Sequence, residues 1–162
     1  MTTSAQLRPV GADATIAHLF IGALLFSTPT EVQAVLRHVE LDDFDEPARS
    51  VLGSIKTVAG QGAPSSSELV KDDLRRRGKL TRERAVWLAS ATTSGACASA
   101  ARHYAAAAVA ESLRRLTESF GAALCEVAES GAETNVAHLA DAAAARIRGV
   151  SVRLGELRGG EL

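Results

Sequence analysis

The chain has 162 residues, of which 46% are hydrophobic and only 4% aromatic, and its formal net charge at pH 7 is −1. This length predicts one compact domain with an appendage, and the apolar content is sufficient for an aliphatic core. A net charge near zero excludes a general electrostatic attraction to nucleic acid or anionic lipid.

Residues 1–12 are expected to form a flexible N-terminus, and residues 13–97 a small globular body of five to six helices. Helix starts are predicted where a capping residue or a proline precedes an apolar periodic segment. These starts are at Asp13, at Thr28 in a capping box with Glu31, at Pro47, at one of the serines 65 to 67, and at Thr81. Among the three serines, Ser65 has capping-box spacing to Glu68. Gly60 and Gly78 are expected to end the third and fourth of these helices. No segment sustains an alternation of apolar and polar residues, so the sequence predicts no sheet.

A long helix is predicted from Ala98 to Glu129, because this segment contains no proline and is rich in alanine, the best helix former. A second helix follows Gly131, and its apolar residues recur roughly every 3.5 residues up to Leu157, as in coiled coils. Together they predict an antiparallel hairpin over residues 98–158 that projects from the body, with residues 159–162 as a tail. Their apolar residues are the candidate interface for self-association: Leu113, Leu116, Phe120, Leu124, Val136, Ala140, Ala143, Ile147, Val150 and Leu154.

The sequence contains no arrangement typical of a catalytic or metal site. Gly78-Lys79-Leu80-Thr81 resembles the end of a phosphate-binding loop, but the upstream glycine of that pattern is replaced by Asp73. The four histidines lie on separate helices without acidic or cysteine neighbours at ligand spacing. Four acidic residues, Asp42, Asp43, Asp45 and Glu46, are better explained as caps on the dipole of the next helix than as acid–base catalysts. We therefore expect no enzymatic activity, no cofactor and no metal.

Two features indicate the cellular compartment. Cys97 and Cys125 are expected to be mostly buried free thiols of a cytosolic protein rather than a disulfide. The apolar run at residues 19–26 is too short to span a bilayer and follows no basic segment. We expect a soluble, cytoplasmic protein with no membrane partner.

A basic stretch at residues 75–84 allows two interpretations. Cations suit the end of a helix, and Asp72, Asp73 and Glu83 partly neutralise them, which favours a solvated face. The alternative is contact with nucleic acid or an acidic partner through Arg75, Arg76, Lys79 and Arg82. We expect DNA binding to be weak or absent.

Several short motifs occur in a fixed order along the chain. They are Ile21-Gly22-Ala23-Leu24-Leu25, Asp43-Phe44, Pro47-Ala48-Arg49, Gly62-Ala63-Pro64, Leu74 with Arg77-Gly78-Lys79-Leu80, Thr92-Thr93-Ser94, His103-Tyr104-Ala105 and Leu113-Arg114-Arg115-Leu116. In this order they resemble the N-terminal domain of the DnaB-type replicative DNA helicases, over about residues 13–130. Phe44, Pro47, Gly78 and Tyr104 are the expected structural motif residues, and Phe44 is expected to be buried between the second and third helices.

The resemblance implies a six-helix body with a helical hairpin, hairpins that pair between subunits, and assembly into a ring collar that docks primase. The ATPase domain of the helicases, with its phosphate loop, has no counterpart in the sequence, so we expect neither ATP hydrolysis nor DNA unwinding. Three functions remain open. They are a freestanding interaction module that forms a homodimer or an oligomer of dimers and binds helicase or primase, a small DNA-binding regulator, and a degenerate remnant of a helicase domain.

Overall fold

The computed structural model describes residues 14–159, and over that range the chain is all-α with no strand, as expected. Seven α-helices follow one another: α1 (Ile16–Leu25), α2 (Pro29–Leu36), α3 (Ala48–Gly60), α4 (Ser67–Arg76), α5 (Arg82–Thr92), α6 (Ala101–Ser130) and α7 (Glu133–Leu157). Two short 3-10 turns, η1 (Leu41–Asp43) and η2 (Ala98–Ala100), precede α3 and α6. The expectations for residues 1–12 and for most of the tail lie outside the described residues.

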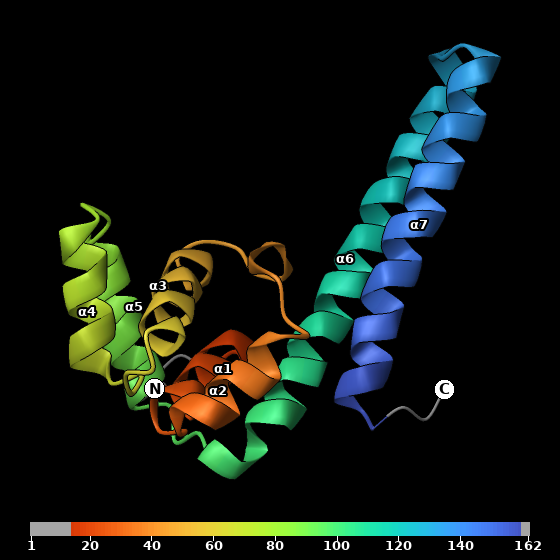
Figure 1. Ribbon diagram of the computed structural model, residues 1–162. Coiled ribbons are helices and arrows are strands. Elements are labelled where there is room, and N and C mark those ends of the chain that lie inside the picture. Colours follow the sequence, from red (N-terminus) through yellow and green to blue (C-terminus); the bar gives the residue numbers. More distant parts are fainter. Residues whose placement is uncertain (1–13, 160–162) are drawn as a thin grey trace, which may run out of the picture.

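Helices α1–α5 form a globular body, and α6 and α7 form an antiparallel hairpin that projects from it (Figure 1). The first turns of α6 pack against α1, and the last turns of α7 lie beside the same end of the body. One hydrophobic core therefore includes residues of α1–α5, the start of α6 and the end of α7. The long helix is thus partly body and partly projecting arm.

Most helix starts follow the expected local chemistry. Thr28 and Glu31 form the expected capping box on α2, and the Thr81 hydroxyl accepts a hydrogen bond from the Arg84 amide at the start of α5. The α4 cap is Ser66, one of the three expected serines, and the Leu69 amide donates to its Oγ. Ser65, the serine with capping-box spacing to Glu68, is instead fully buried. This shift of one residue follows from packing, because a residue turned into the core cannot also cap the first turn.

The first helix begins later than expected. Its N-cap is Thr15, whose side chain accepts a hydrogen bond from the His18 amide. Asp13, the expected cap, lies outside the described residues.

Two helices end in Schellman turns that require glycine. Gly78, with φ +65°, ends α4, and the Lys79 amide donates to the Leu74 carbonyl. Gly60, expected to end α3, is instead its last helical residue, and Gly62, with φ +74°, takes the left-handed position while the Ala63 amide donates to the Val58 carbonyl. Both positions place the backbone where a side chain would be strained.

Both cysteines differ from the expectation of burial. Cys97 precedes η2 and Cys125 lies on the projecting part of α6, and both are free and exposed. The sequence suggested burial because free thiols are usually buried, but neither position faces the core.

Candidate interaction surface

A buried carboxylate connects the body to the base of the hairpin. Asp43, at the end of η1, is 3% exposed and forms a bidentate ion pair with Arg153 of α7, with N···O distances of 2.6 and 3.1 Å. Asp43 also accepts hydrogen bonds from the Ser112 hydroxyl of α6, at 2.9 Å, and from the Glu40 amide, at 2.8 Å. These donors satisfy both carboxylate oxygens, which is the condition for burying a charge without a large desolvation penalty.

The electrostatics of Arg153 reflect this pairing. Burial alone would lower the pKa of the Arg153 guanidinium, but the hydrogen bond and charge of Asp43, together with Glu40, raise it. Glu40 Oε2 lies 3.6 Å from the same guanidinium. The arginine is therefore held as a cation between two carboxylates of the η1 region.

The acidic residues before α3 do not cap that helix, contrary to expectation. The N-cap of α3 is Pro47, no side-chain hydrogen bond caps it, and its first turn contains no acidic residue. Glu46 accepts a hydrogen bond from the Ser50 hydroxyl and lies 3.5 Å from Arg84, while Asp43 faces the hairpin. Spacing along the chain could not reveal these partners, because most of them lie on distant elements.

Further polar contacts hold the base of the hairpin. Arg102 of α6 donates to the Leu157 and Glu156 carbonyls at the end of α7, at 2.8 and 2.6 Å. The His38 ring, after α2, lies 2.9 Å from Glu156, and Arg115 donates to the Asp43 carbonyl at 2.7 Å. Together with the Asp43–Arg153 pair, these contacts fix the direction in which the hairpin leaves the body.

The apolar seam of the hairpin is well buried only from the middle of α7 to its base. Ala143, Val150 and Leu154 are at most 8% exposed. The remaining expected interface residues are half-buried (Leu113, Leu116, Phe120, Leu124 and Ile147) or exposed (Val136 and Ala140). Within the hairpin, no residue of α6 after Ser112 and none of α7 before Ala143 is fully buried. The seam also includes half-buried Leu139, one position before Ala140, which the sequence analysis missed.

The motif residues occupy structural positions. Phe44 lies between α2 and α3 in the chain and is 4% exposed, as expected. Its ring stacks on Phe20 of α1, with ring centroids 5.5 Å apart. Pro47 begins α3, and Tyr104 is half-buried on the part of α6 that belongs to the body.

The basic stretch is not gathered on one surface. Arg76 pairs with Asp72 and Asp73, at 3.3 and 3.4 Å. Arg82 lines a groove beside Trp87, whereas Lys79 lines a separate cleft against α3. This separation, together with the ion pairs, favours the solvated-face interpretation for most of the stretch over a continuous nucleic-acid contact.

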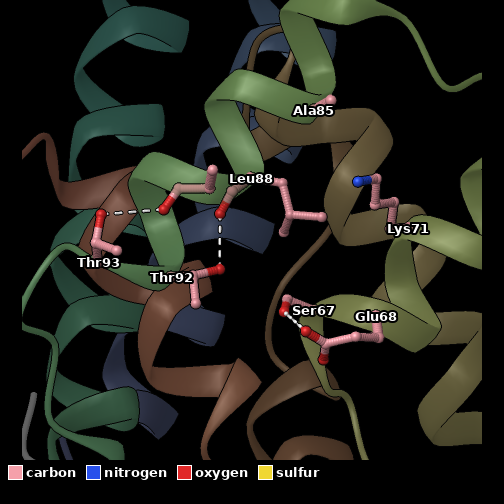
Figure 2. Close-up of a pocket in the computed structure, with 8 residues that line it drawn as sticks. Ser67, Glu68, Lys71, Ala85, Leu88, Thr92 and Thr93 are labelled. Atoms are coloured by element: carbon pink, nitrogen blue, oxygen red, sulfur yellow. Dashed lines mark hydrogen bonds between the residues drawn. The ribbon is translucent and has the colours of Figure 1, made fainter.

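A groove between α4 and α5, with a volume of about 290 Å³, offers little chemistry (Figure 2). Its hydroxyl groups are used locally: Thr92 and Thr93 donate to the carbonyls of Leu88 and Ala89, and Ser67 donates to Glu68. Within residues 14–159, no three His, Cys, Asp or Glu side chains are arranged to hold a metal ion. Over the same residues, no helix combines the length and apolar character needed to cross a bilayer.

The fold and the surfaces define an all-α domain built from a small helical body and a hairpin fixed to it by a buried ion pair. The chain is similar to the crystal structure of the N-terminal domain of DnaB helicase from Mycobacterium tuberculosis, with 28% sequence identity and a TM-score of 0.67. The match covers 87% of this chain and 99% of the other, which confirms the resemblance inferred from the sequence. No family model and no curated protein sequence matches the chain.

Proposed function

We propose that the protein is a non-catalytic interaction module of DNA replication that self-associates through its hairpin and binds a replication partner, either the replicative helicase or primase. The similarity to the DnaB helicase N-terminal domain supports a role alongside the replication machinery. The proposed role requires no ATP hydrolysis and no cofactor.

The observation that carries the proposal is the uncovered seam of the projecting hairpin. Phe120, Leu124 and Ile147 remain half-buried, and Val136 is 37% exposed, on the projecting part of the hairpin. Leu113 and Leu116, nearer the base, are half-buried and pack against the core of the body. Two helices bury only one side of each seam against each other, whereas two hairpins packed as a four-helix arrangement bury both sides. In a dimer with twofold symmetry, the same apolar surface of each subunit packs against its copy, so one such surface per subunit is sufficient.

Small residues on α7 suit such packing. Ala140 is exposed, follows half-buried Leu139 directly, and lies about one helical turn before buried Ala143. Alanines let neighbouring helices approach closely while larger side chains fill the spaces between them. We expect the interface to bury more than about 1,000 Å² in total, the area typical of a specific complex.

The test is the mass of the protein in solution. Light scattering should give twice the chain mass of 16.9 kDa or a higher even multiple for the wild type, and the chain mass for Ile147→Glu, which places a charge in the seam. Ala145→Glu is the matched control, because Ala145 is exposed and about 200° around the helix from Ile147. A wild type that is monomeric at about tens of micromolar, or a control that dissociates equally, contradicts self-association through this seam.

The replication partner is tested separately. Purified replicative helicase and primase from the same cells are each immobilised, and binding of the wild type and of folded Ile147→Glu is measured. Saturable binding of the wild type to either protein supports the proposal. If the wild type binds neither protein, the proposed binding to helicase or primase is wrong. Self-association is then decided by the mass measurement alone.

A further inference from the structure

A cleft on the body brings together cations that are far apart in the sequence. It has a volume of about 350 Å³ and lies between α3 and the turn that joins α4 to α5. Arg49 and Lys56 line it from α3, and Arg77 and Lys79 line it from the turn. The sequence shows only the second pair as part of a basic stretch, because the first pair joins it through the packing of α3 on α4.

The positive charge of the cleft is only partly compensated. Arg77 pairs with buried Asp73, with Nε 3.0 Å from Oδ2, and contacts the Thr57 hydroxyl. Arg49 lies 3.8 Å from Asp42 and donates through Nε to the Phe44 carbonyl. The guanidinium groups of these two arginines are therefore largely engaged by other groups of the protein. They line the cleft but offer few hydrogen-bond donors to a ligand.

The two lysines remain available. Within residues 14–159, neither Lys56 nor Lys79 forms an ion pair, and the only hydrogen bond of the Lys56 ammonium goes to the Val39 carbonyl at 2.7 Å. Burial lowers the pKa of Lys56, although the charges of Asp43 and Glu40 act in the opposite direction. A partly buried ammonium with spare donors is stabilised by an anion that enters the cleft.

The remaining lining selects the type of anion. Glu46 is the one carboxylate in the lining, and its charge is offset by Arg84, while its Oε1 accepts a hydrogen bond from Ser50. Ser54 also lines the cleft and is 2% exposed. Ammonium groups and a hydroxyl around a small concave space suit the oxygens of a phosphate.

We propose that this cleft binds the phosphate moiety of a small anionic ligand of the pyrophosphate class. The lining contains no aromatic side chain on which a base could stack. The volume lies near the lower end of small-ligand sites. The net charge of −1 and the concave, localised cluster of cations favour a small anion over a nucleic-acid strand, which needs a longer basic surface. The site lies on the body and does not depend on the proposed self-association.

The probe is inorganic pyrophosphate, titrated by calorimetry into the wild-type chain at constant ionic strength. We expect saturable binding with one site per chain. Lys79→Gln and Lys56→Gln should each weaken it by about tenfold, because each removes one charge-assisted hydrogen bond. Lys71→Gln, which removes an exposed lysine from α4 outside the cleft, should leave the affinity within about twofold.

Two comparisons make the result decisive. Lys79 is exposed, and its side chain has no partner among residues 14–159. Lys79→Gln therefore tests the site even if Lys56→Gln unfolds the chain, which circular dichroism would reveal. A single-stranded oligonucleotide titrated at the same salt concentration tests the competing ligand. The proposal is overturned if pyrophosphate does not bind saturably, or if Lys71→Gln loses as much pyrophosphate affinity as the cleft variants. It is also overturned if the chain prefers the oligonucleotide and this preference depends on Lys79.

Discussion

At the scale of single residues, Asp43 joins three elements that are distant in the sequence. Its carboxylate receives donors from η1, α6 and α7, and Arg153 is 110 residues away along the chain. Its neighbour Asp42 is exposed, and the one ion pair of its side chain among the described residues is a long one, with Asp42 Oδ1 3.8 Å from Arg49 Nη2. The two aspartates are adjacent and chemically identical, so their different importance comes from burial and from the donors that tertiary packing brings to Asp43.

Asp43→Asn should destabilise the protein by about 3–5 kcal/mol, because it leaves the guanidinium of Arg153 without its buried partner. Chemical denaturation followed by circular dichroism measures the free energy of unfolding. Asp42→Asn is the control and should change it by less than about 0.5 kcal/mol, as for exposed pairs. Equal effects of the two substitutions would show that the Asp43–Arg153 pair does not hold the hairpin.

Phe44→Ala tests the buried aromatic motif. Removing a ring that is 4% exposed and stacked on Phe20 should cost about 3–5 kcal/mol, through lost burial and the cavity left behind. Phe26, at the end of α1, is 62% exposed, so Phe26→Ala should cost less than about 1 kcal/mol. Melting temperatures that fall equally in the two variants would contradict this assignment.

At the scale of elements, the crossing of α1 and α5 depends on a glycine. A Cβ atom at Gly22 would lie 2.5 Å from the Ala91 carbonyl oxygen and 2.6 Å from Ser94 Oγ. The first of these is backbone, so the two helices would have to separate to admit a methyl group. The central position of α1, with Phe20, Ile21 and Leu24 fully buried, makes any such shift spread through the core.

Gly22→Ala is therefore expected to lower the free energy of unfolding by about 1–3 kcal/mol, as for other overpacked sites. Gly149→Ala should have the opposite effect on stability. Gly149 lies inside α7, and a methyl group at this position would meet no neighbouring atom within 4 Å, so alanine there should stabilise the protein by about 0.5–1 kcal/mol. A neutral or stabilising Gly22→Ala would mean that α1 and α5 pack less closely than the structure indicates.

At the scale of the whole molecule, the two ends of the hairpin differ in how they are held. The base shares the core of the body and is fixed by Asp43, Arg102 and Arg153. The distal part, toward the turn between Ser130 and Glu133, has only the partner helix to pack against. Segments with fewer buried contacts open more readily.

Hydrogen exchange measured at several protein concentrations should detect this difference. In the wild type, protection of residues 116–147 should rise with concentration as hairpins pair, while protection of α1 and α3 should stay constant. In Ile147→Glu the distal protection should not depend on concentration. Protection of the distal hairpin that is already as high as that of α1 in a dilute monomer would contradict the proposed role of self-association in covering the seam.

Much of the fold was determined by the sequence locally. Thr28 and Glu31 cap α2, Thr81 caps α5, and Gly78 ends α4, because each of these signals acts within four or five residues of backbone. The alanine-rich segment and the heptad-like pattern likewise predicted the hairpin. The ordered short motifs between Ile21 and Leu116 indicated the resemblance to the DnaB helicase N-terminal domain, which the structure comparison confirms.

Only the tertiary structure decided which polar residues meet. It turned Ser65 inward and made Ser66 the cap, left both cysteines exposed, and paired Asp43 with Arg153. It also placed two cations of α3 beside two of the α4–α5 turn. The physical reason is that a cap depends on its nearest backbone neighbours, whereas a buried ion pair or a cleft depends on how helices far apart in the chain pack together.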